Sequence, residues 1–409
     1  MSEFLRWRRD GRVPRRRLPV VDNKVEIPSD RPVRVGVVGC GAIAEVHLGI
    51  LSRIPNAQII ALADPAVDAR ERLAQKYRVP ATFDTLSDML QREKPEVVHI
   101  LAPAQLHAKL AIEAMESGCH VLVEKPMALN AQEAKKMVAV ARKKKVKLSV
   151  GHNHLFDRVM LQAREILARG ELGRITYVES WYGVSLSSDA GNRALSYEAR
   201  DAWFYRMPGS LYQDFISHPI SLLMDVMPEV RLTGCAAGYF RVVPYMQSDE
   251  LRVLLKGDEV LGSLCVSLAA SPRYQFMRIY GTKGSMTVDV LNKYVFVDRS
   301  PGFLPKTISR NLSNIRRGKT LLGAGLKNLF HFMMGKLSLF EGTERMIRLF
   351  YRSVLLDEPV PVSPEEGLQS MRLMDEIWRR LGTKENGRLR QVGRKESQSK
   401  TKRVTKSTV

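Results

Sequence analysis

A glycine-rich turn that directly follows a short apolar run constrains the fold more than any other feature of this sequence. The run Val33–Val38 is rich in valine and leads straight into a Gly-Cys-Gly-Ala-Ile-Ala segment that begins at Gly39. Gly39 allows a tight turn, Gly41 lets a pyrophosphate approach the backbone, and Ala44 replaces the third glycine that often packs such a helix against its strand. A strand, a dinucleotide-binding loop and a helix are therefore predicted in that order.

Further cofactor-binding residues are predicted around this turn. The amide groups of Ala42 and Ile43, at the start of the predicted helix, are expected to receive the phosphates. Asp64 ends the second predicted strand, where an acid accepts hydrogen bonds from the adenosine ribose and repels a 2′-phosphate. We therefore expect NAD to be preferred over NADP. Two alternatives stay open: Asp64 also suits a helix cap before Pro65, and Arg70 is close enough in sequence to attract a phosphate.

Short apolar runs alternate with helical segments through the first part of the chain. Continuous apolar strands between helices indicate a parallel sheet covered on both faces. This pattern is typical of the α/β class with a doubly wound (Rossmann) sheet. The predicted strands are Val33–Val38, Ile59–Ala63, Val97–Ala102, His120–Val123 and Leu148–Val150, and helical segments include Gln105–Ser117 and Ala131–Lys144.

After about residue 153 the strands become longer and alternate in polarity. The turns at 256–258 and 281–284 indicate hairpins, so we predict an α+β domain built on an open, largely antiparallel sheet that backs the substrate site. Near the end, Ser363-Pro364-Glu365-Glu366 has the spacing of a capping box and predicts a helix over Pro364–Leu381. The predicted strands are Ile175–Trp181, Arg231–Phe240, Leu251–Leu255, Gly262–Ala269, Met277–Tyr280 and Ser285–Val290.

The net charge of +21 is concentrated in three segments. Residues 1–34, 293–352 and 379–409 carry +5, +9 and +9, which leaves the rest close to neutral. Because a near-neutral core is not the electrostatic footprint of a nucleic-acid-binding domain, we expect no specific nucleic-acid partner.

Targeting signals and cysteine usage indicate a cytoplasmic protein. No stretch approaches the roughly 18 consecutive apolar residues that cross a bilayer, and the basic N-terminus lacks the apolar run of a signal peptide. The cysteines are far apart and form no Cys-x-x-Cys pair, so we expect buried thiols in a reducing compartment rather than disulfides or a zinc site. They are Cys40, Cys119, Cys235 and Cys265.

These changes along the chain predict four parts. Residues 1–32 are expected to form a basic extension, and residues 33–153 an NAD-binding domain. Residues 154–383 are expected to form the substrate and oligomerisation domain, with a basic insertion at about 293–352. Residues 384–409 have the composition of a disordered basic tail.

A resemblance to a known family becomes specific at Glu124-Lys125-Pro126, which follows a later strand at the carboxyl edge where such sheets bind ligands. Together with Gly39-Cys40-Gly41 and His47, and with Pro103 and His107, this motif resembles the glucose-fructose oxidoreductase, inositol dehydrogenase and rhizopine-catabolism (Gfo/Idh/MocA) family. The resemblance covers about residues 33–290 and returns in the last helix. It implies that Pro103, His107, Glu124 and Lys125 lie at the cofactor.

The same resemblance implies a catalytic constellation of Lys125, Asp214 and His218. Asp214 and His218 are four positions apart and share one face of a helix. Histidine is the side chain suited to act as a base near pH 7, so His218 is the candidate base. Lys125 is expected to hydrogen-bond the reacting oxygen, and Asp214 to orient or tune the imidazole and contact a neighbouring hydroxyl.

Other assignments are less direct. His107 by family position lies near the nicotinamide, although a histidine at a helix start is often structural. Asn153 is expected to reach a substrate hydroxyl, and no cluster has metal-ligand spacing. Two departures from the family pattern put substrate contacts in doubt: Pro208-Gly209-Ser210 replaces a glycine run, and Ser221 replaces an acid.

The expected function is hydride transfer between NAD and a hydroxyl carbon of a sugar, inositol or sugar nucleotide, by a homo-oligomer. Two alternatives stay open. Some relatives are NAD-dependent glycoside hydrolases, which oxidise transiently and regenerate the cofactor. A non-catalytic NAD-binding sensor or scaffold would bind without turnover.

The basic segment has no counterpart in the family pattern. Apolar residues there recur at steps of three and four, which predicts an amphipathic helix whose basic flanks favour weak, peripheral contact with anionic membranes. The alternative is that the apolar stripe packs on its own domain or on a partner subunit. The stripe consists of Leu322, Leu326, Leu329, Phe330, Met333, Leu337 and Phe340.

Overall fold

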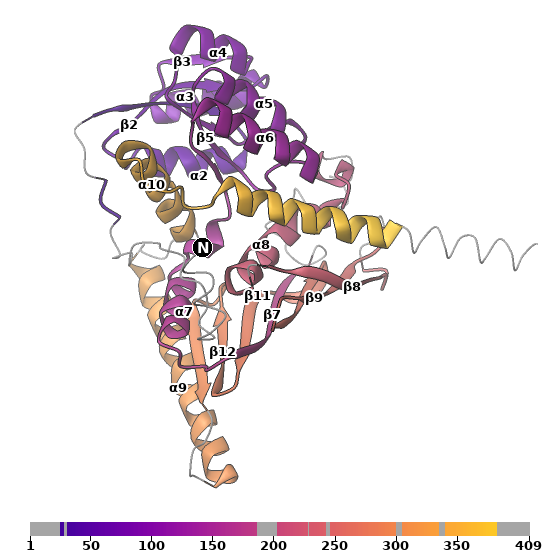
Figure 1. Cartoon of the computed structure of the whole chain (residues 1–409). Helices are drawn as coiled ribbons and strands as arrows, with labels where there is room; N and C mark the ends of the chain where they lie inside the picture. The colour runs from indigo at the N-terminus through magenta and orange to yellow at the C-terminus, as the bar shows by residue number, and fades with distance from the viewer. Residues whose placement is uncertain are drawn as a thin grey trace, which may run out of the picture.

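The structure is a computed structural model. It describes residues 25–27, 31–185, 203–227, 229–242, 246–299, 305–334 and 340–382. Two sheets lie one above the other in Figure 1, with a long helix between them.

The first sheet confirms the predicted Rossmann fold. Its six strands are all parallel, in the order β3-β2-β1-β4-β5-β6. This order places the switch point beside β1, so the loops after β1 and β4 face each other at the carboxyl edge. The strands are β1 (Val33–Val38), β2 (Ala57–Ala63), β3 (Ala81–Phe83), β4 (Val97–Ile100), β5 (His120–Val123) and β6 (Leu148–Val150). The helices are α2 (Ala42–Leu51), α3 (Val67–Tyr77), α4 (Leu86–Glu93), α5 (Ala104–Glu116) and α6 (Ala131–Lys144).

The second sheet is open, mixed and largely antiparallel, as predicted. Its order is β13-β12-β11-β7-β10-β9-β8, and only the β7–β10 pair is parallel. Both predicted hairpins are present, between β9 and β10 and between β11 and β12. The strands are β7 (Ile175–Ser185), β8 (Arg231–Gly238), β9 (Glu250–Lys256), β10 (Leu261–Ser267), β11 (Ala269–Gly281), β12 (Gly284–Asp289) and β13 (Tyr294–Arg299).

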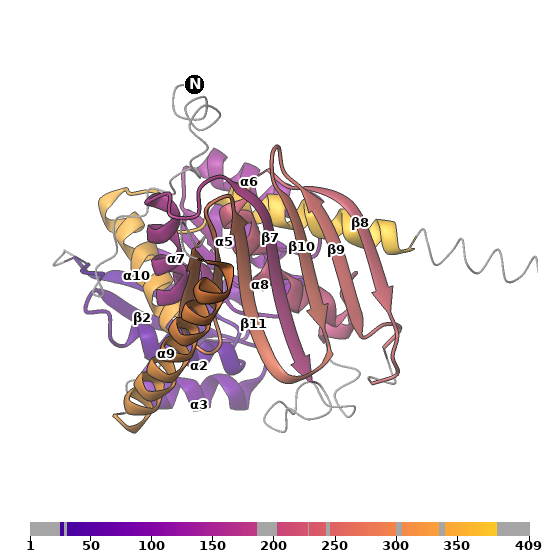
Figure 2. The same cartoon turned by 90° about the horizontal axis from the view of Figure 1, so that it is seen from below.

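Helices cover the face of this sheet that is turned toward the Rossmann domain (Figure 2). Helix α8 (Leu211–Val226) contacts β7 and β10, and α7 (Arg158–Ala168) contacts β12 and β13. A short 3-10 helix, η1 (Asn153–Phe156), leads from β6 into α7, and η4 (Trp203–Arg206) precedes α8. Side chains along β9 alternate between buried and exposed, so this strand is half buried as its alternating sequence predicts.

The structure divides the basic segment 293–352 into three elements with different surroundings. Strand β13 extends the second sheet, while α9 (Lys306–Met333) projects beyond the sheets in Figure 1. Helix α10 (Glu341–Leu356) returns to the Rossmann domain and packs against α2 and η1.

The last helix runs over residues 364–382, as the capping-box spacing predicts. The amide of Ser363 donates to Glu366 Oε2 at 2.8 Å, and the amide of Glu366 donates to Ser363 Oγ at 3.3 Å. The helix lies between the two sheets, where Asp375 accepts a hydrogen bond from the Ala131 amide at the start of α6. It thereby ties the end of the described chain to the first domain.

Candidate active site

The glycine turn after β1 has the geometry that a dinucleotide needs. Gly39 has φ +94°, and a Cβ there would lie 2.6 Å from the backbone of Leu101 and Ala102, so a side chain would collide with the loop after β4. A Cβ on Gly41 would meet no atom within 4 Å, which leaves the backbone open to a ligand. Helix α2 begins at this glycine without a side-chain cap, so its first amides face this open side.

The cysteine between the two glycines is not a reactive group. Cys40 is buried, and burial together with the nearby Asp64 carboxylate raises the pKa of its thiol to about 12. A thiol that stays protonated is neither a nucleophile nor a metal ligand at neutral pH.

Asp64 lies at the end of β2 and faces the glycine turn. Its Oδ2 accepts a hydrogen bond from the Cys40 amide at 2.7 Å, and its Oδ1 accepts one from Ala66 at 2.8 Å. The local capping role and a position beside the cofactor loop therefore coexist, because each carboxylate oxygen retains a second lone pair.

Arg70 lies directly behind Asp64. Its guanidinium donates to the Asp64 carbonyl at 2.9 Å and forms an ion pair with Asp84. The positive charge that could attract a 2′-phosphate is thus already paired with a carboxylate.

Lys125 and Asp214 join the two domains at the carboxyl edge of the Rossmann sheet. Lys125 follows β5, and its Nζ donates to Asp214 Oδ1, on α8, at 2.7 Å. Burial alone would lower the pKa of this ammonium, but the ion pair with Asp214 raises it above its ordinary range. Lys125 therefore stays charged, and one of its three N–H donors remains for a ligand oxygen.

His218 lies one helical turn after Asp214. The structure differs here from the expectation that Asp214 orients the imidazole, because the carboxylate pairs with Lys125 instead. Among the described residues, no hydrogen-bond partner is found for either ring nitrogen of His218. Burial, followed by the influence of His154 and Lys125, holds its pKa well below the usual range. His218 is consequently a neutral imidazole, and the ring nitrogen that carries no hydrogen is available to accept a proton.

Two aromatic side chains that are not part of the predicted constellation contact this imidazole. The ring of His154 meets it edge-on, with centroids 4.7 Å apart, and the ring of Tyr182 stacks on it at 5.6 Å. Asp157 Oδ2 lies 2.7 Å from His154 Nδ1, and Lys293 donates to the other carboxylate oxygen. Burial would raise the pKa of Asp157, but its bonds to His154 and Lys293 lower it.

The sequence around these neighbours gives little indication that they lie close to His218. His154 and Asp157 are three positions apart just after β6, at the ligand-binding edge of the sheet. Tyr182 lies inside a strand, and its hydroxyl accepts a hydrogen bond from Arg273 at 3.2 Å. Nothing in the local pattern separates this tyrosine from any other aromatic residue of a strand.

A buried chain of hydrogen bonds extends from Glu124 to helix α10. Glu124 Oε1 lies 3.3 Å from His47 Nε2, His47 Nδ1 lies 2.9 Å from His99 Nδ1, and His99 Nε2 lies 3.3 Å from the Tyr351 hydroxyl. Burial would raise the pKa of Glu124, but its bonds to His47 and the nearby Lys125 lower it. An ionised Glu124 can only accept, so His47 donates to it, His99 donates to His47, and Tyr351 donates to His99. Two neutral imidazoles satisfy every link.

His107, in the first turn of α5, is buried. Its ring nitrogens lie 2.8 Å from the Pro126 carbonyl and 2.7 Å from the Ala102 carbonyl, and burial lowers its pKa. Both nitrogens therefore face the backbone of the loops after β4 and β5, and His107 joins these loops. Pro103 precedes α5 in the first of them.

Asn153 is not brought to the Lys125, Asp214 and His218 cluster by any contact in the described residues. Its amide nitrogen donates to Thr343 of α10 at 3.0 Å. Within the Pro208-Gly209-Ser210 segment, the middle position requires glycine, because a Cβ on Gly209 would lie 2.2 Å from the Trp378 ring. Ser221 donates to the His218 carbonyl at 2.9 Å within α8.

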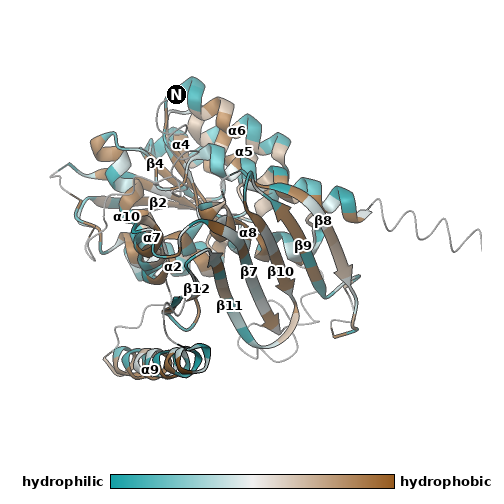
Figure 3. Cartoon of the chain, turned by 60° about the horizontal axis from the view of Figure 1, so that its bottom comes forward, coloured by the Kyte–Doolittle hydropathy of each residue, from teal (hydrophilic) through white to brown (hydrophobic). Residues whose placement is uncertain are grey.

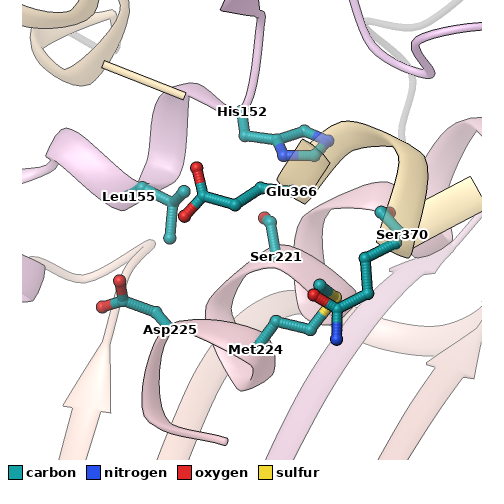
Figure 4. A pocket seen from close by; sticks show the side chains of 8 residues that line it. His152, Leu155, Ser221, Met224, Asp225, Glu366 and Ser370 are labelled. Carbon is teal, nitrogen blue, oxygen red and sulfur yellow. The ribbon is translucent and has the colours of Figure 1, made fainter. Parts of the chain in front are cut away.

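A small cavity of about 50 Å³ lies next to this cluster (Figure 4). It is lined by His152, after β6, by Ser221 and Asp225 on α8, and by Glu366 and Ser370 on the last helix. Lys125 and His218 are not part of its lining, so the cavity adjoins the cluster and does not contain it. In the part of the chain that the structure describes, no group of three or more His, Cys, Asp or Glu could hold a metal ion.

Comparison with known proteins identifies both domains. Residues 33–152 match the model of the oxidoreductase family with the NAD-binding Rossmann fold, and residues 160–287 match that of the GFO/IDH/MocA C-terminal domain. The chain is 33% identical over 145 residues to D-glucoside 3-dehydrogenase of Escherichia coli strain K12, a match that spans 35% of this chain and only 41% of that protein. It is 22% identical to scyllo-inositol 2-dehydrogenase (NAD(+)) of Bacillus subtilis strain 168, over 64% of this chain and 75% of that one.

Solved structures show the same fold. The WlbA dehydrogenase from Bordetella pertussis, in complex with NADH and UDP-GlcNAcA, superimposes with a TM-score of 0.67 at 21% identity. The superposition covers 87% of this chain and 96% of that chain.

Proposed function

This chain belongs to the GFO/IDH/MocA family of NAD-binding oxidoreductases, and from that premise we propose that it transfers hydride between NAD and a hydroxyl-bearing carbon of a sugar-like substrate. The proposal rests on the ion pair between Lys125 and Asp214, which brings Lys125 next to the α8 helix that also bears His218. Lys125 follows β5 at the carboxyl edge of the Rossmann sheet, and Asp214 and His218 come from helix α8 of the second domain, so the proposed donor and base are contributed by different domains.

Each of the three side chains has its own role in the oxidation of an alcohol. Bound NAD supplies the acceptor for the hydride that leaves the carbinol carbon. Lys125 donates a hydrogen bond to the substrate oxygen and stabilises the negative charge that develops as its proton leaves. A ring nitrogen of His218 takes that proton, so a ketone and an imidazolium result. Asp214 holds the Lys125 ammonium in position and keeps it charged.

NAD is the proposed cofactor in preference to NADP. The support is the Asp64 carboxylate at the glycine turn and the ion pair that occupies Arg70. A 2′-phosphate placed there would meet a carboxylate and no free arginine in this loop, which is unfavourable for a dianion.

The proposed substrate is a sugar, an inositol or a sugar nucleotide. Support comes from the family, whose members include a D-glucoside 3-dehydrogenase and a scyllo-inositol 2-dehydrogenase, and from the WlbA structure with UDP-GlcNAcA. We propose that Lys125, Asp214 and His218 contact the reacting hydroxyl and its neighbour, and that Asn153 contributes only if it leaves Thr343.

The test is a screen of the purified chain with NAD against glucosides, inositols and UDP-sugars, followed through NADH absorbance. Net NADH formation with at least one substrate class, lost in the Lys125→Ala variant, is the expected result. Cleavage of a glycoside without net NADH would replace the proposal with glycoside hydrolysis. NAD binding without turnover of any of the three classes would replace it with a sensor or scaffold.

A further inference from the structure

Helix α9 packs on the protein through its polar side. Its half-buried residues recur at steps of three and four and therefore lie on one face. On that face Ser313 Oγ donates to Asp298 at 2.7 Å, and Asn328 Nδ2 donates to the Asn292 carbonyl at 2.8 Å. The half-buried residues are Ser309, Ser313, Thr320, Ala324, Asn328 and His331.

The opposite face of α9 is apolar and points away from the protein. Its members recur with the same spacing, and Leu322, Leu326 and Met333 are 66%, 59% and 67% exposed. No residue of the helix is buried. The alternative that the apolar stripe packs on its own domain is therefore wrong for the described part of the stripe. The face consists of Ile308, Leu312, Ile315, Leu322, Leu326, Leu329, Phe330 and Met333.

This arrangement leaves one long apolar line on the outside of the molecule. At about 1.5 Å per residue, the stripe from Ile308 to Met333 extends for roughly 40 Å. In Figure 3, hydrophobic residues, drawn in brown, recur along the length of α9. Apolar surface of this length is unusual on a monomer and marks a contact with something else.

The positive charge of α9 indicates what kind of surface would cover its apolar face. No Asp or Glu occurs between residues 300 and 340, whereas the helix carries six Lys and Arg. Arg316, Lys319 and Lys327 lie beside the apolar face, on one flank. A second copy of α9 would add a second positive flank, with no acid on either helix to pair with it. An anionic lipid surface offers hydrocarbon for the apolar face and negative headgroups for the basic flank.

We propose that α9 lies in the interface of an anionic membrane, with its apolar face among the lipid chains and its basic flank at the headgroups. The catalytic domains then stay in water on the polar side of the helix. The contact is peripheral: among the described helices, none is long and apolar enough to cross a bilayer.

The test is co-sedimentation of the full chain with vesicles of phosphatidylglycerol and phosphatidylcholine, and with pure phosphatidylcholine, at low and high salt. Binding to the anionic vesicles at low salt, with much less at high salt or on neutral vesicles, is expected. The triple variant Arg316→Gln, Lys319→Gln, Lys327→Gln should weaken partitioning on the order of 100-fold, since each basic residue near the surface contributes about 1 kcal/mol.

A second variant distinguishes vesicle binding through α9 from vesicle binding through the basic terminal segments. Leu322→Ser with Leu326→Ser removes apolar area and keeps every charge, and it should weaken binding at least tenfold. Phe240→Ser is the matched control, because Phe240 is 70% exposed after β8, away from this helix. Unchanged binding in the leucine variant would overturn the proposal in favour of attachment by the terminal segments.

The oligomeric state distinguishes a lipid from a second copy. Light scattering without vesicles should give the same mass for the wild type and the leucine variant. Dissociation of the variant into smaller species would overturn the membrane proposal and assign the apolar face to a subunit contact. Equal binding to anionic and neutral vesicles, or no binding to either, would also overturn it.

Discussion

Lys125 and His218 are held in opposite charge states by their surroundings. Lys125 keeps its proton because Asp214 lies 2.7 Å away, and His218 stays neutral because burial of the ring, followed by the influence of His154 and Lys125, lowers its pKa. At neutral pH this cluster therefore holds a charged ammonium and a neutral imidazole.

Removing either group should slow turnover without loss of cofactor. We expect His218→Ala and Lys125→Ala to reduce kcat on the identified substrate by about 10²-fold to 10⁴-fold, the usual effect of losing a positioned acid or base. NAD affinity, measured by calorimetry, should be nearly unchanged. Full activity in either variant, shown to be folded by circular dichroism, would refute the role given to that residue.

The pH dependence of kcat/KM for oxidation should show a broad plateau. His218 must be neutral to act, and because its pKa is lowered, activity should persist as the pH falls through the ordinary value of 6.5. Lys125 must be charged, and because its pKa is raised, activity should persist up to the ordinary value of 10.5. Asp214→Asn should move the alkaline limb to lower pH, since burial then acts on Lys125 without the ion pair. An alkaline limb that does not move would contradict this account.

Asp64 should set the cofactor preference. Asp64→Ser removes the negative charge beside the ribose position, so the ratio of NADP to NAD dissociation constants should fall toward one. Asp68→Ser is the control, because that acid is exposed in the first turn of α3. Equal or reversed affinities in the unmodified chain would show that Asp64 does not exclude the 2′-phosphate.

At the scale of the element, α9 and α10 show how surroundings decide the stability of a helix. Helix α10 has nine buried residues, whereas α9 has none and contains Gly318, Gly323 and Gly325 in open surroundings. Most helical stability in proteins comes from packing of an apolar face. Helix α9 lacks that packing and should open more readily than its neighbour.

Replacing two of these glycines should stabilise α9. Gly323→Ala and Gly325→Ala each remove a helix penalty of about 1 kcal/mol, and a Cβ at either position meets no atom within 4 Å. Hydrogen exchange of the α9 amides should slow in the double variant. Gly342→Ala in α10 is the contrasting control, because its Cβ would lie 2.5 Å from the Asn153 carbonyl and should lower stability. Unchanged exchange in α9 would mean that helix propensity does not limit it.

Across the whole molecule, α10 is linked through the interior to the loop after β5 that carries Glu124 and Lys125. The chain from Tyr351 through His99 and His47 to Glu124 connects residues more than 200 positions apart, and Glu124 is next to Lys125. Because the chain is buried and every link has one donor, removing the first donor leaves an unsatisfied acceptor in the core.

Tyr351→Phe should therefore destabilise the fold without touching the site. We expect the free energy of unfolding to fall by about 1–3 kcal/mol, the cost of a buried acceptor that loses its partner. Denaturant titration measures this change, with Tyr280→Phe as the control at an exposed tyrosine. Equal stability of the two variants would show that this series of buried hydrogen bonds makes no net contribution to the free energy of unfolding.

The Rossmann fold and its glycine turn could be predicted from the sequence alone, because the constraints there are local. A glycine with positive φ, a valine-rich run and a helix start are each read within a few residues, and the capping box at Ser363 is of the same kind. The parts missed by pattern were short or at an edge: β3 has only three residues, and β13 lies within the basic segment.

Which residues meet across the chain became clear only from the folded arrangement of the elements. The pairing of Lys125 with Asp214 instead of Asp214 with His218, the contact of His154 with His218, and the attachment of Asn153 to Thr343 join elements that are distant in sequence. The direction of the α9 stripe is of the same kind: periodicity fixes that a helix has an apolar face, but the contacts of its polar face with Asp298 and Asn292 determine that this face points outward.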